Sequence, residues 1–123
     1  MFIDIHTHAY HPKIADKVLA QLEGHYGIPP VGTGQIDDLL ARATKAGLDK
    51  VVVHNAATAP AQVVPANNWA IAIHREHKRI ISFGTLHPDY PDFERELDRL
   101  WRNGIKGIKF HADFQGFRLD DRK

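Results

Sequence analysis

The chain alternates short apolar runs with longer stretches in which apolar residues recur every three or four positions. The short runs predict strands and the longer stretches predict amphipathic helices, because side chains alternate across a strand but return to one face of a helix after three or four residues. We predict four strands, at residues 2–5, 50–54, 79–86 and 105–111. The β-branched run "KVVVH" (50–54) is typical of a strand buried on both faces of a parallel sheet.

Four amphipathic helices are expected between these strands, within residues 13–27, 35–47, 65–78 and 92–104. Thr33 is a candidate N-cap for the second of them, since its hydroxyl can accept a backbone N–H of the first turn. The resulting order is β-α-α-β-α-β-α-β, which predicts an α/β fold of parallel strands joined by right-handed crossovers.

Composition is that of one ordinary globular domain spanning residues 1–123, with 43% hydrophobic and 25% charged residues. The 16 basic and 15 acidic residues are scattered, so no basic stripe favours nucleic acid as a partner. Apolar runs are far shorter than a membrane span requires. We therefore expect a small-molecule substrate, with neither nucleic acid nor membrane as partner.

The chain has nine histidines and no cysteine. Without cysteine there are no disulfides and no thiolate ligands, which fits the cytoplasmic location that we expect. A transition-metal site in this chain would be built from imidazole and carboxylate groups, which suit zinc, iron, manganese or nickel.

Five histidines lie at predicted strand ends or within two residues of them: His6, His8, His54, His87 and His111. Ligands of parallel β/α folds bind at the carboxyl ends of the strands, so this placement predicts a site there. The other four are interpreted as surface residues: His11, His25, His74 and His77.

His6 and His8 are the strongest candidates for metal ligands. Two residues apart on a strand, they point to the same face and can occupy neighbouring positions around a divalent ion, for which zinc is our first choice. Asp4 could orient one of the rings as a hydrogen-bond acceptor behind it. The alternative is that both rings only line a polar strand end, hydrogen-bonded to backbone or water.

His111, at the end of the fourth predicted strand, is our candidate catalytic residue, either as a third ligand or as a group that holds the substrate. Its alternative role is a simple strand-end hydrogen bond. Lys109 shares its face and could be a structural cation or a carbamylated bridging ligand. We expect Lys109 to line the substrate site together with His54, His87 and Asp113, the last of which could also serve as a base.

Three segments in order, "IDIHTH" (3–8), "GTLHPD" (84–89) and "GIKGIKFHADFQGF" (104–117), resemble the amidohydrolase superfamily. The resemblance covers the whole chain and is greatest to metal-dependent hydrolases related to amidohydrolase-2 and carboxymuconate-semialdehyde decarboxylase. It implies a (β/α)8 barrel in which His6 and His8 match the first-strand metal ligands. It also implies that a metal-activated water attacks an amide, ester or similar carbon centre, with decarboxylation as the chemistry of related members.

Two neighbouring families with an H-x-H opening are runners-up. The deoxyribonuclease-like branch normally has a glutamate where this chain has His111. Polymerase-and-histidinol-phosphatase domains usually continue with a Ser-Asp-Gly element, where this chain has "AYHPK".

Only four strands are predicted, whereas a complete barrel needs roughly 200 residues or more. The family's ligands on the fifth, sixth and eighth strands, two histidines and an aspartate, have no counterpart here. The chain therefore resembles the N-terminal half of a barrel with two open edges, and we expect it to form a homo-oligomer, most simply a dimer. It is then either a hydrolase completed by a partner copy or a catalytically incompetent fragment that self-associates and at most binds metal.

Overall fold

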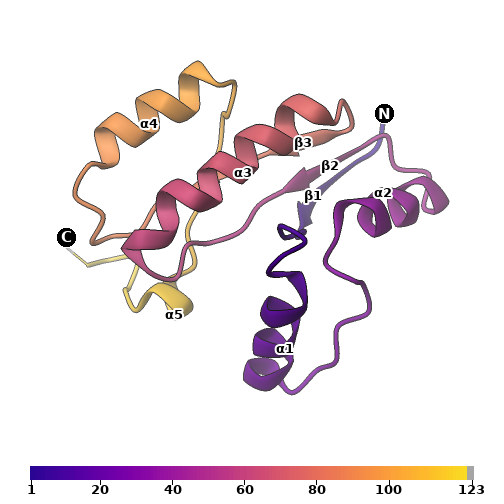
Figure 1. Cartoon of the computed structure of the whole chain (residues 1–123), viewed down its shortest axis with the longest axis horizontal. Coiled ribbons are helices and arrows are strands. Elements are labelled where there is room, and N and C mark those ends of the chain that lie inside the picture. The colour runs from indigo at the N-terminus through magenta and orange to yellow at the C-terminus, as the bar shows by residue number, and fades with distance from the viewer. Residues whose placement is uncertain (122–123) are drawn as a thin grey trace.

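A computed structural model describes residues 1–121 (Figure 1). Its strands are β1 (Ile3–Thr7), β2 (Lys50–Val53), β3 (Ile80–Ser82), β4 (Gly84–Thr85) and β5 (Ile108–Lys109). Its α-helices are α1 (Ala15–Tyr26), α2 (Ile36–Lys45), α3 (Val63–Glu76), α4 (Phe93–Arg102) and α5 (Ala112–Gln115), with a 3₁₀ turn at Pro60–Gln62. The alternation of strands and helices confirms the predicted α/β class.

All strand pairs are parallel, and neighbours in space follow the order of the chain. The third predicted strand, 79–86, is interrupted at Phe83: its first part, β3, pairs with β2, and its second part, β4, pairs with β5. Phe83 joins the two parts, since its N–H donates to the Val53 carbonyl while the N–H of Gly84 donates to Gly107. The strand layer is thus two small parallel sheets that share one segment of chain.

The fourth predicted strand, 105–111, is much shorter than expected and pairs only at Ile108–Lys109. The chain turns at His111 into α5, a short helix that the sequence pattern did not predict. Thr33 does not cap α2, because Gln35 occupies the N-cap position. α1 continues past Gly24 and ends at Gly27, whose φ of 66° is the left-handed conformation that glycine adopts without strain.

One face of the strand layer is packed against helices α2 and α3, as Figure 1 shows. Alternation along the strands turns Val53, Ser82 and Gly84 toward this side, where a Cβ on Gly84 would meet Leu100 of α4 and Asn67 of α3. The core at this face consists of Ala9, Ala43, Val51, Val53, Ile73 and Ile80. Residues that alternate with these lie on the opposite face, which holds the candidate site.

Buried polar side chains fasten the β4 segment to the helices. Asn67 donates through Nδ2 to the Thr85 carbonyl (3.0 Å) and to Glu96 Oε1 (2.7 Å), and its Oδ1 accepts from the Thr85 N–H (2.7 Å). Gln115 of α5 donates to the carbonyls of Ala57 and Leu86, both at 2.7 Å. These hydrogen bonds help to satisfy backbone and carboxylate groups that are buried in the fold.

Candidate metal centre

Three histidines meet at the carboxyl ends of β1 and β2. Thr7 pairs with Val53, so His8 and His54 follow at matching positions on the same face of the sheet. Between these pairs the register shifts: Asp4 pairs with Val51 and Thr7 with Val53, so β1 contains one more residue than β2 over this stretch. The His6 ring contacts both of the others, with centroids 5.1 Å from His8 and 4.5 Å from His54.

The spacing of the imidazole nitrogens suits one metal ion. Nε2 of His6 lies 3.2 Å from Nε2 of His8, and one nitrogen of each of the three rings lies within 4.8 Å of the others. Two nitrogens bound to a tetrahedral zinc ion at ~2.0–2.1 Å stand about 3.3 Å apart. The His6–His8 pair already has this separation, and His54 supplies a third nitrogen.

His54 is the buried member of the group, at 5% exposure, whereas His6 and His8 are exposed. Among residues 1–121, its Nδ1 is the one buried side-chain nitrogen or oxygen for which no hydrogen-bond partner is found. Buried polar atoms are nearly always paired, so an unpaired one beside two further imidazoles points to a missing ligand. The residue types and the unpaired nitrogen both fit a transition-metal ion of the zinc kind.

The backbone of β2 orients His8. Its Nδ1 lies 2.6 Å from the His54 carbonyl oxygen and 3.4 Å from Asn55 Oδ1. A carbonyl only accepts hydrogen bonds, so Nδ1 carries the proton and Nε2 keeps its lone pair, which is the usual arrangement behind a metal-binding histidine. The prediction for Asp4 was wrong in this respect, because its Oδ1 accepts the backbone N–H of His6 at 3.0 Å.

Burial lowers the pKa of two of the three imidazoles, those of His54 and His8. Burial lowers the pKa of His54 to about 4, with further lowering by His8, His6 and Lys109. Burial also lowers the pKa of His8, although its hydrogen bond to the His54 carbonyl opposes the shift. Both rings are therefore uncharged near neutral pH, the form in which imidazole binds metal.

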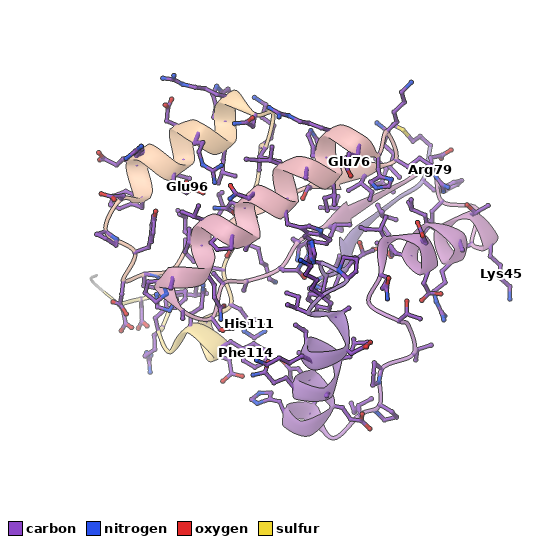
Figure 2. The ribbon with its side chains drawn as sticks, in the orientation of Figure 1. Lys45, Glu76, Arg79, Glu96, His111 and Phe114 are labelled. Atoms are coloured by element: carbon purple, nitrogen blue, oxygen red, sulfur yellow. The ribbon has the colours of Figure 1, made fainter. Side chains whose placement is uncertain are left out.

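The remaining predicted site residues lie elsewhere around the strand ends. His111 is the N-cap of α5: its Nδ1 accepts from the N–H of Phe114 (3.4 Å), and the two rings are 4.6 Å apart, as Figure 2 shows beside α5. This is the strand-end hydrogen bond foreseen as its alternative role, and His111 does not belong to the three-histidine group. Its catalytic role stays a prediction.

Two further residues predicted to line the substrate site pair with residues outside the three-histidine group. His87 is buried, and its Nδ1 accepts from the N–H of Asp89 at 3.2 Å. Asp113 is exposed and pairs with Nε2 of His25 at 3.2 Å. His25, interpreted as a surface residue, thus links α1 to α5 across 88 positions of sequence.

His54 has a larger part in the site than the sequence pattern suggested, since it completes the group of three rather than only lining it. The sequence contained a signal for this role. His54 follows directly after β2, and consecutive strands of β/α units usually pair side by side, which brings the end of β2 next to the end of β1.

Comparison of the chain with protein-family models, with curated proteins and with solved structures found no match in any of the three. Within residues 1–121, none of the helices combines the length and the apolar character needed to cross a bilayer.

Proposed function

We propose that this chain binds a divalent transition-metal ion, zinc first, through His6, His8 and His54, and acts as a metal-dependent hydrolase of the amidohydrolase kind. The observation that carries the proposal is the convergence of three imidazole nitrogens within 4.8 Å, one ring being buried with an unpaired nitrogen. Substrates would be small amides, esters or related carbon compounds, as the resemblance of the three sequence segments implies.

Three protein ligands favour a catalytic site over a structural one. Structural zinc sites are closed by four protein ligands, whereas catalytic sites keep one position for water or substrate. A bound ion of this kind would lower the pKa of that water and polarise a substrate carbonyl. The chain's own contribution is to hold the ion with three imidazoles and to fix the orientation of His8 through the His54 carbonyl.

The arrangement of the strands supports a barrel-like parent fold. Sequential parallel strands with helices on one face and chemistry on the other are what the first half of a (β/α)8 barrel requires. Within residues 1–121, β1 and β5 each pair with a single strand, and Phe2, Ile5 and Phe110 are exposed near these edges. We propose that two copies cover these edges in a homodimer, which would also bring two metal centres into one assembly.

A metal-binding protein without catalysis is the second candidate. The observation in its favour is that the group of three contains no carboxylate, so a general base must come from outside it. Asp113 or a partner copy would have to supply that base. Decarboxylation is the alternative chemistry that the same resemblance allows.

Isothermal titration of the metal-free protein with zinc tests the site. We expect one ion per chain, a loss of affinity of more than about 100-fold for His6→Ala/His8→Ala and for His54→Ala, and no change for the control His77→Ala at the end of α3. Wild-type affinity in the double variant would refute the metal site.

An ester and amide hydrolysis screen of the zinc-loaded protein then separates the two candidates. Zinc-dependent turnover that disappears in His6→Ala/His8→Ala supports the hydrolase. Activity that survives the double change refutes the metal mechanism, and tight zinc binding without turnover supports the non-catalytic candidate.

A further inference from the structure

Lys109 lies on the same face of the strand layer as the three histidines. Ser82 pairs with Val53, so Phe83 and His54, one residue further along each strand, share the opposite face. Thr85 lies two residues beyond Phe83 and pairs with Lys109, which places Lys109 on that face as well. A cation on β5 therefore borders the same surface as the imidazoles on β1 and β2.

One aromatic ring separates the histidines from β5. The Phe83 ring stacks on His54, with centroids 6.2 Å apart and planes at 28°. The same ring lies close to Gly107, where an added Cβ would stand 2.6 Å from the ring carbons. Gly107 precedes Lys109 by two residues on the same face, so Lys109 follows directly after the position that the Phe83 ring covers.

The backbone of Lys109 is held firmly while its charge is not neutralised. Its carbonyl accepts from Thr85 Oγ1 at 2.9 Å, and Thr85 is only 2% exposed. Among residues 1–121, no salt bridge to Lys109 is found. Its half-buried side chain belongs to the face of the strand layer that carries the imidazoles of His8 and His54.

We propose that the three-histidine site accepts small carboxylates, whose anionic group binds Lys109 while the reacting group lies at the metal. The Phe83 ring fixes the distance between these two anchors and offers an apolar surface between them. This inference rests on the proposed metal site and adds a substrate class to it. An ammonium for which residues 1–121 provide no salt bridge selects a negative charge, because a charge-assisted hydrogen bond is stronger than a neutral one.

Two metal-binding probes of similar size test the inference, because hydroxamates bind zinc and cobalt whatever their tail. Succinic monohydroxamate carries a carboxylate, and butanohydroxamate has a methyl group in its place. The affinity of each is measured by calorimetry and by the visible spectrum of the cobalt-loaded protein. We expect the wild type to prefer the carboxylate probe by about tenfold or more.

Lys109→Met keeps most of the aliphatic stem and removes the charge, so we expect it to abolish this preference and leave butanohydroxamate binding unchanged. Lys106→Met is the matched control, since Lys106 lies over the Trp101 ring of α4 at 3.1 Å from its centroid and should keep the wild-type preference.

Equal affinity of the wild type for both probes, or a preference that survives Lys109→Met, would overturn the inference while leaving the metal site intact. Loss of zinc binding in Lys109→Met would also overturn it, because Lys109 would then belong to the metal ligands. Failure of the wild type to bind zinc would overturn the inference and the proposed function together.

Discussion

The two ends of the strand layer differ in whether their buried polar side chains are hydrogen-bonded. At the β4–α5 end, the buried side-chain amides of Asn67 and Gln115 form hydrogen bonds of 2.7–3.0 Å with backbone groups, and Asn67 also donates to Glu96. At the β1–β2 end, the Nδ1 of the buried His54 has no hydrogen-bond partner in the described part of the chain, and the exposed rings of His6 and His8 lie against it. Both ends contain polar side chains inside the fold, yet only the first is complete.

Buried polar side chains can thus have two roles: some stabilise the fold through hydrogen bonds, and others are placed to bind a ligand. A satisfied network stabilises one conformation, and Glu96 illustrates it: burial alone would raise the pKa of this carboxyl, but hydrogen bonds from Arg99 and Asn67 outweigh burial and lower it. An unsatisfied cluster costs stability and persists where it serves a ligand. Substitutions at the two ends should therefore change stability in different directions and by different amounts.

The largest effect is expected from Asn67→Leu at the satisfied end. It removes three hydrogen bonds and leaves the N–H and carbonyl of Thr85 buried without partners, so the free energy of unfolding should fall by roughly 3 kcal/mol. Urea denaturation measures the change. Asn68→Leu, the same substitution at the exposed neighbouring position, should cost much less, and equal losses in both variants would contradict the comparison.

At the β1–β2 end, His54→Leu should change the free energy of unfolding in the opposite direction. Without metal, replacing the imidazole, whose buried Nδ1 has no hydrogen-bond partner among residues 1–121, by an apolar side chain of similar size should raise the free energy of unfolding by about 1 kcal/mol, reduced by the loss of its backbone hydrogen bond with Ile5. With zinc at 100 times its dissociation constant, the wild type should gain about 2.7 kcal/mol and the variant none. Melting curves with and without zinc measure both, and a destabilised metal-free variant would contradict the assignment.

The smallest effect is expected at the contact between α1 and α5. His25 and Asp113 form an exposed pair, with side chains 45% and 67% exposed, so solvent screens their attraction. Asp113→Asn should change the free energy of unfolding by less than about 0.5 kcal/mol in urea denaturation. A loss above 1 kcal/mol would mean that α5 depends on this pair rather than on Gln115.

The local pattern of the chain was enough to predict the α/β class and the positions of the main helices and strands. It was also enough to predict the pairing of His6 with His8, since two residues on one strand share a face regardless of what surrounds them. These features depend on periodicity within short segments, which is why they could be predicted without a fold.

The features that sequence reasoning missed depend on contacts between distant segments. The strand is interrupted at Phe83, where the chain changes pairing partner from β2 to β5 and the Phe83 ring lies against Gly107, 24 positions later in the chain. His111 turns away from β5 because its ring nitrogen accepts a backbone N–H of α5, whose four residues are too few to show a helical period. The grouping of His54 with His6 and His8 depends on the register of β1 against β2, which the sequence pattern does not give.

The contact between Phe83 and Gly107 also has an evolutionary consequence. Any side chain at position 107 would displace a ring that stacks on His54, so substitutions there would disturb the histidines from a strand that contributes none of them. Position 109, two residues further, carries no such steric restriction, so a change of its side chain would alter the charge offered to a substrate without moving the Phe83 ring. The choice of substrate could therefore change through position 109 while glycine stays at 107 and the histidines keep their places.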